Sequence, residues 1–237
     1  LVKGPVTPGV CILTALVLSL WDRNGAWLRA TRPVAGLAVL LAIVLPWLIA
    51  IWIQTHGNFF TQSLGGDFAS KLAGGQESHG ALPGYYLVLA SVALWPATLF
   101  LIPAIAFAAI RRDAPAVRFL IVWAASVWVV AEIVPTKLPH YVLPAYPALA
   151  ALMALWAVSE VPLKREGLLR FAAIVQYGLG VLAVAAAPIA ATTIYAGHAP
   201  IWLMAASVLG GVIGLLAIPC FFRRDEGGAI VFALAGA

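Results

Sequence analysis

Long apolar runs, separated by short polar segments, fill this chain from one end to the other. A helix needs about 20 apolar residues to cross a bilayer. Runs of that kind occur at 6–20, 34–53, 84–110, 116–134, 144–159, 168–192 and 200–222, with a shorter run at 229–237. The pattern predicts an all-α, polytopic transmembrane helical bundle, with seven spans and part of an eighth in a single domain over residues 1–237. Because the first run begins near residue 1 and the last is short, we expect a fragment of a longer membrane domain.

The composition also indicates a membrane-embedded chain. Of the 237 residues, 63% are hydrophobic and 10% are charged, whereas a soluble domain has about 25% charged residues. The formal net charge of +5 would favour a nucleic-acid ligand if the cations formed one patch or a basic tail. They are divided among separate loops instead, so we predict no nucleic-acid partner.

The distribution of charge predicts which side of the membrane each loop faces. Eleven of the fourteen lysines and arginines lie in alternate loops, as Arg23, Arg29, Arg32, Arg111, Arg112, Arg118, Lys164, Arg165, Arg170, Arg223 and Arg224. Cytoplasmic loops carry such an excess, so we place the connections 54–83, 135–143 and 193–199 on the external side. The other cations, Lys3, Lys71 and Lys137, then lie outside, either as snorkelling interfacial residues or as functional ones.

The longest loop, 54–83, has the features of a surface element. Apolar residues recur in it every four positions, at Phe60, Leu64, Phe68 and Leu72. This spacing predicts a short amphipathic helix on the outer membrane surface. Glu77 and His79 follow and are candidate ligands for a divalent metal. Because no third ligand accompanies them, a structural or substrate-contacting role is the simpler interpretation.

Residues 135–147 form a proline-rich segment between two of the apolar runs. Backbone broken by proline leaves hydrogen-bonding groups unsatisfied, and at membrane depth it persists only where it is buried in protein or lines a watery cavity. We therefore expect Lys137, His140 and Tyr141 to face such a cavity. Glu132, just upstream, is costly at a membrane helix end unless it has a partner. It is predicted either to pair with Lys137 or to take part in catalysis.

Three segments resemble the membrane region of glycosyltransferase family 39, and together they cover about residues 1–160. They are Leu1-Val2-Lys3-Gly4-Pro5; Phe59-Phe60 with Gly66-Asp67 through Lys71 and His79-Gly80-Ala81-Leu82-Pro83-Gly84-Tyr85-Tyr86; and Pro135-Thr136-Lys137-Leu138-Pro139-His140-Tyr141-Val142-Leu143-Pro144. This family includes bacterial lipid A aminoarabinose transferases and protein O-mannosyltransferases. The resemblance implies a multi-pass enzyme of the GT-C fold in the bacterial inner membrane. Such an enzyme transfers a sugar from a polyprenyl phosphate to a glycolipid, polysaccharide or protein at the periplasmic face.

The resemblance also implies roles for individual residues. Lys3, Lys71 and Tyr141 would hold the carrier phosphate and stabilise the charge that develops on it as the sugar leaves, with Lys137 and His140 as helpers. The catalytic aspartate of the family lies upstream of the Lys-Gly-Pro motif. We therefore assign no catalytic residue in this chain and expect the chain alone to be inactive.

The chain departs from the family pattern next to the aspartate of the predicted loop helix. Gly66 stands where many relatives have a histidine, which puts in doubt any metal or polar contact made there. Asp67 corresponds to a loop-helix position, so we do not assign it as the general base.

A transporter, a channel or a lipid flippase is the alternative interpretation of this membrane chain. Transporters tend to carry charged residues at mid-membrane and broken spans in matching halves. Here the helix centres lack charge, and the broken segment lies at the outer boundary. Lysine suits a phosphate as a point charge, so the external lysines favour a polyprenyl phosphate ligand.

Overall fold

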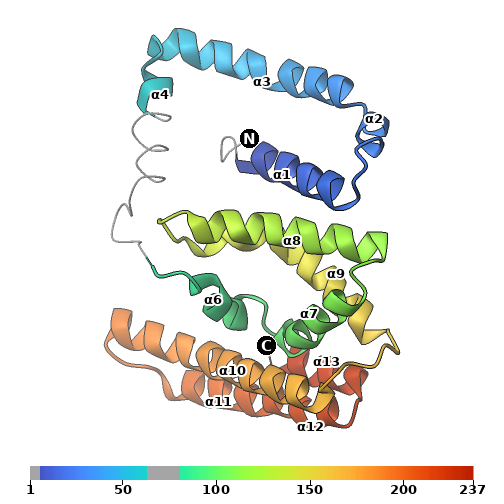
Figure 1. Ribbon diagram of the computed structural model, residues 1–237. Coiled ribbons are helices and arrows are strands. Elements are labelled where there is room, and N and C mark those ends of the chain that lie inside the picture. The colour runs from blue at the N-terminus through green and yellow to red at the C-terminus, as the bar shows by residue number, and fades with distance from the viewer. Residues whose placement is uncertain (1–5, 63–80, 237) are drawn as a thin grey trace. The chain divides into compact units, whose positions relative to one another are not determined.

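The computed structural model describes residues 6–62 and 81–236 (Figure 1). Every regular element in these residues is a helix, which confirms the all-α prediction. Within the described ranges, helices long and apolar enough to cross a membrane occupy Pro33–Thr55, Pro115–Ile133, Pro139–Ala157, Glu166–Ala196 and Ile201–Phe222. The chain is therefore a polytopic membrane protein.

The chain divides into two compact units, residues 1–85 with 122–145 and residues 86–121 with 146–237. The first unit contains α1 (Val6–Trp21), α2 (Trp27–Ala30), α3 (Pro33–Thr55), α4 (Asn58–Phe60), the C-terminal part of α8 (Pro115–Ile133) and η3 (Pro139–Ala145). The second contains α6 (Tyr85–Ala93) from its second residue, η2 (Ala97–Phe100), α7 (Leu101–Ile110), the start of α8, α9 (Tyr146–Ala157), α10 (Glu166–Ala196), α11 (Ile201–Leu215), α12 (Ala217–Phe222) and α13 (Glu226–Ala235).

In the first unit, α3 begins with Pro33 at its first helical position, where a missing N–H costs nothing. The helix ends where His56 and Gly57 take positive φ angles of 48° and 82°. This turn brings α4 back onto the end of α3, and the rings of Trp52 and Phe60 lie 5.6 Å apart. The loop helix predicted through Phe60 to Leu72 falls mostly in residues 63–80, outside the described residues.

The span predicted near 84–110 is not one unbroken helix. The chain there forms α6, η2 and α7, with the break at Pro96. Proline has no N–H to donate and disfavours helical geometry in the residue before it, so the helix stops although the sequence stays apolar. The resulting pieces, Tyr85–Ala93 and Ala97–Ile110, are each shorter than the roughly 20 residues that one helix needs to cross a bilayer.

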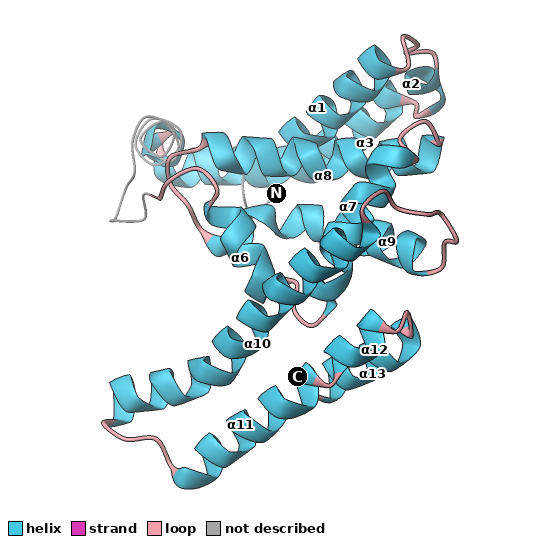
Figure 2. Ribbon diagram, turned by 60° about the horizontal axis from the view of Figure 1, so that its bottom comes forward, coloured by secondary structure: helices cyan, strands magenta, loops and turns pink. Residues whose placement is uncertain are grey.

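In the second unit, aromatic rings from three elements form a core. Phe100 of η2 lies 5.9 Å from Trp156 of α9 and 5.7 Å from Phe221 of α12, between ring centroids. The long helix α10, about 46 Å at 1.5 Å per residue, pairs with α11 as an antiparallel hairpin (Figure 2). At Gly180, α10 approaches the backbone of α6 so closely that a Cβ atom would overlap the carbonyl oxygen of Ser91.

Candidate functional site

Three of the predicted phosphate-site residues are described by the structure. Lys137, His140 and Tyr141 all lie in the first unit, between α8 and α9. Lys3 and Lys71 lie outside the described residues, as do Glu77 and His79. The part of the site that can be described is therefore the proline-rich segment, together with the residues that contact it.

The end of α8 explains where the Lys137 side chain goes. An interior carbonyl at Ala131 would accept from the N–H four residues on, but that residue is Pro135, which has none. The Lys137 ammonium takes its place, with Nζ 3.0 Å from the Ala131 carbonyl oxygen and 2.5 Å from that of Glu132. Lysine thus caps the C-terminus of α8, the end that favours a positive charge.

The Glu132 carboxylate completes this arrangement. Its Oε2 atom lies 3.4 Å from Lys137 Nζ, so the ion pair that the sequence offered as one alternative is present. The same oxygen accepts a hydrogen bond from the Gly84 N–H at 3.2 Å. Gly84 has a φ of 95°, a conformation that costs glycine little and other residues more. One carboxylate therefore joins the end of the long loop to the proline-rich segment.

His140 and Tyr141 lie in η3 on the less buried part of the segment. Their ring centroids are 5.0 Å apart and the rings are nearly perpendicular, at 89°. His140 is exposed and Tyr141 is half-buried, whereas the Lys137 side chain is 2% exposed. The imidazole and the phenol are thus the more accessible polar groups of the segment, and both can hydrogen-bond a phosphate.

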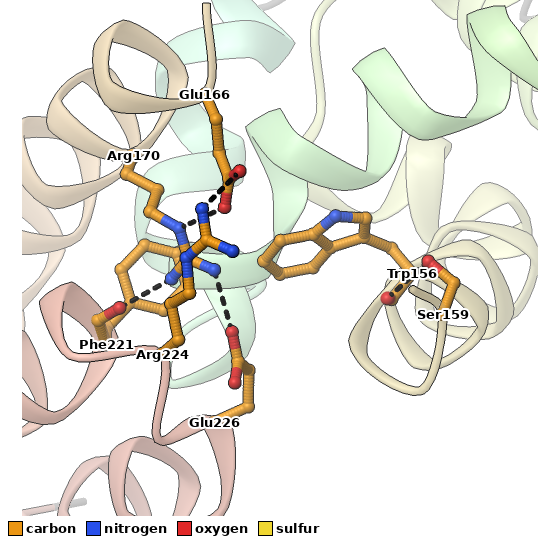
Figure 3. Close-up of polar contacts among 7 residues, drawn as sticks. All are labelled: Trp156, Ser159, Glu166, Arg170, Phe221, Arg224 and Glu226. Atoms are coloured by element: carbon orange, nitrogen blue, oxygen red, sulfur yellow. Dashed lines mark hydrogen bonds and ion pairs between the residues drawn. The ribbon is translucent and has the colours of Figure 1, made fainter. Parts of the chain in front are cut away.

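A second polar cluster, in the other unit, centres on Arg170 (Figure 3). Its guanidinium donates to Glu166 at 2.9 Å, to Glu226 at 2.8 Å and to the Phe221 carbonyl oxygen at 2.5 Å. The ring of Phe221 lies 4.7 Å from the guanidinium carbon, and that of Trp156 lies 5.6 Å from it. The charge pattern of the loops marks Arg170 only as a topology signal, although its spacing from Glu166 is that of a helical ion pair.

The acidic, histidine and cysteine side chains of the described residues form no recognisable metal site. Within residues 6–62 and 81–236, no three histidine, cysteine, aspartate or glutamate side chains are placed so that they could hold a metal ion together. The metal-ligand candidates Glu77 and His79 are outside that set, so the prediction about them stays a prediction.

The chain is similar to bacterial arabinosyl transferases. It is 31% identical over 187 residues to the undecaprenyl phosphate-alpha-4-amino-4-deoxy-L-arabinose arabinosyl transferase of Pseudomonas aeruginosa and 30% identical over 188 residues to that of Pseudomonas paraeruginosa. Both alignments cover 78% of this chain and 34% of the relative. The transferase of the same name from Photorhabdus laumondii is 27% identical over 229 residues, which are 92% of this chain and 40% of that relative.

The chain thus spans about a third of the length of the Pseudomonas relatives it matches, at 34%. No protein-family model and no solved structure matches it.

Proposed function

We propose that the protein containing this chain transfers a sugar from an undecaprenyl phosphate carrier to an acceptor at the periplasmic face of the bacterial inner membrane. The observation that carries the proposal is the similarity, over 78% of the chain, to transferases whose names state such a donor. Those names make 4-amino-4-deoxy-L-arabinose the first sugar to test. Lipid A is the first acceptor to test, because the segment resemblance extends to lipid A aminoarabinose transferases.

The chemistry of the donor supports the proposal. A polyprenyl phosphate keeps its tail in the lipid and its anion at the interface, so its enzyme needs polar and cationic groups at the membrane boundary. In the proposed site, Lys3, Lys71 and Tyr141 contact the phosphate, with His140 beside Tyr141. Lysine acts on phosphate as a point charge, and a tyrosine hydroxyl donates a hydrogen bond to it.

The proposed reaction is a displacement at the anomeric carbon of the sugar. The bond from that carbon to a phosphate oxygen breaks, and its electron pair stays on the undecaprenyl phosphate. The acceptor oxygen forms the new bond to the same carbon and gives its proton to a base, for which no residue is assigned in this chain. Positive and hydrogen-bonding groups at the phosphate stabilise the charge that develops as the sugar leaves.

A direct transfer assay tests the proposal. Membranes are prepared from cells that express the gene containing this chain and from cells that lack it. Labelled 4-amino-4-deoxy-L-arabinose on undecaprenyl phosphate is supplied together with lipid A, and labelled lipid A is measured. Transfer only in the first membranes is expected. Movement of the intact donor across the membrane without transfer would contradict the proposal and favour the flippase alternative.

A further inference from the structure

The groups around Glu132 join two parts of the chain that the proposed site needs. Gly84 follows the loop 54–83, and the segment after Pro135 carries His140 and Tyr141. The Glu132 carboxylate accepts from Gly84 N–H and faces the Lys137 ammonium, at 3.2 and 3.4 Å. We refer to Gly84, Glu132 and Lys137 as the carboxylate lock.

The geometry points to Glu132 as a positioning residue. It fixes the end of the loop and the proline-rich segment relative to each other, so that the segment can bind the carrier phosphate. This inference rests on the proposed function and deepens it. In this inference Glu132 makes no contact with the phosphate. It acts through Lys137, whose ammonium is held by the Glu132 carboxylate and by two backbone carbonyls.

The burial of Lys137 supports a positioning role for this lysine as well. Its side chain is 2% exposed, and among the described residues its Nζ atom lies at hydrogen-bond distance from two backbone carbonyls, of Ala131 and Glu132, and from the Glu132 carboxylate. An ammonium has three donors in total. A direct phosphate contact would draw the ammonium away from these oxygens, and the Ala131 carbonyl has no N–H donor at Pro135 to replace it.

The two possible roles of Lys137 predict opposite changes in phosphate affinity when the Glu132 charge is removed. If Lys137 bound the phosphate directly, removing the nearby carboxylate would release the ammonium and reduce repulsion of the anion, so affinity would stay the same or rise. If Glu132 positions the segment, removing its charge lets the segment shift, and affinity falls. Glu132→Gln keeps the size of the side chain and separates the two cases.

The experiment measures binding of undecaprenyl phosphate to the protein that contains this chain, in lipid nanodiscs, with undecaprenol as the ligand that lacks the phosphate. We expect Glu132→Gln and Lys137→Met each to raise the Kd for undecaprenyl phosphate by about tenfold, because each disrupts the charged hydrogen bond between Glu132 and Lys137 that holds the segment in place. The double variant is expected to have the same Kd as either single variant, because both substitutions disrupt the same carboxylate lock. Binding of undecaprenol is expected to stay unchanged, which a general loss of structure would not allow.

Matched controls come from the loop before α10. Glu160 and Lys164 are exposed, so Glu160→Gln and Lys164→Met make the same chemical changes away from the lock. Both are expected to bind undecaprenyl phosphate as the unaltered chain does. An unchanged or lower Kd in Glu132→Gln overturns the inference, and this variant decides the matter if Lys137→Met does not fold.

Hydrogen exchange separates failure of the lock from failure of the proposed function. We expect faster amide exchange at residues 134–141 in Glu132→Gln and no change there in Glu160→Gln. If the protein that contains the unaltered chain binds undecaprenyl phosphate no better than undecaprenol, the proposed function is wrong. The exchange rates alone then test whether Glu132 holds the segment. Equal rates at residues 134–141 in Glu132→Gln and Glu160→Gln would overturn the inference.

Discussion

Arg170 and Glu226, which are 56 residues apart in the chain, meet in an ion pair with Nη2 and Oε1 2.8 Å apart (Figure 3). The contact ties α10 to the first turn of α13. The side chains are 9% and 22% exposed, so water screens the pair little. Because the same guanidinium also binds Glu166 and the Phe221 carbonyl, it holds three segments of the second unit together.

Arg170→Met should therefore destabilise the protein markedly. It leaves Glu226 without its cation and the Phe221 carbonyl without a donor, and breaking a buried pair in this way costs about 3 kcal/mol. The measurement is thermal unfolding in detergent, with a lower Tm as the expected result. Arg224→Met is the matched control, because Arg224 contacts Glu166 at 2.8 Å but is 69% exposed. Exposed pairs contribute about 0–1 kcal/mol, and equal losses in the two variants would contradict this account.

Gly180→Ala should destabilise the contact between α10 and α6. The added Cβ would overlap the Ser91 carbonyl oxygen, and it would also press on the Trp95 ring at 3.1 Å. Overpacking of this kind costs about 1–3 kcal/mol, so a lower Tm is expected. Gly178 lies two residues away in the same helix, and an added Cβ there would meet no atom of the described residues within 4 Å. Gly178→Ala should leave the Tm unchanged or raise it, since alanine favours helix.

Gly84→Ala tests the backbone rather than packing. No described atom lies within 4 Å of the added Cβ, but the φ of 95° is unfavourable for alanine and left-handed geometry costs about 1–2 kcal/mol. We expect the Gly84 N–H to shift away from Glu132 and the amides of residues 134–141 to exchange faster. Gly36→Ala, within α3 and equally uncrowded, should leave exchange at those residues unchanged.

The sequence predicted the class of fold and the position of most helices, because long apolar runs mark the helices of a membrane protein. It missed the break at Pro96, since the surrounding residues stay apolar through the interruption. The pairing of Glu132 with Lys137 could be predicted because the two are five residues apart. The contacts of Arg170 with Phe221 and Glu226 could not, because they join residues 51 and 56 positions away and depend on how α12 and α13 fold back.

Tyr141→Phe addresses the proposed phosphate site most directly. The change removes one hydroxyl and keeps the ring that stands against His140 at 5.0 Å, so the segment should retain its shape. If the hydroxyl donates to the carrier phosphate, the Kd for undecaprenyl phosphate should rise by about tenfold, the loss expected for a hydrogen bond to a charged group, with no change for undecaprenol. Tyr195→Phe makes the same change on a side chain that is 90% exposed at the end of α10 and should bind both lipids normally. Equal affinity of Tyr141→Phe and the unaltered chain for undecaprenyl phosphate would remove Tyr141 from the site, because the lost hydroxyl is then one that the phosphate does not use.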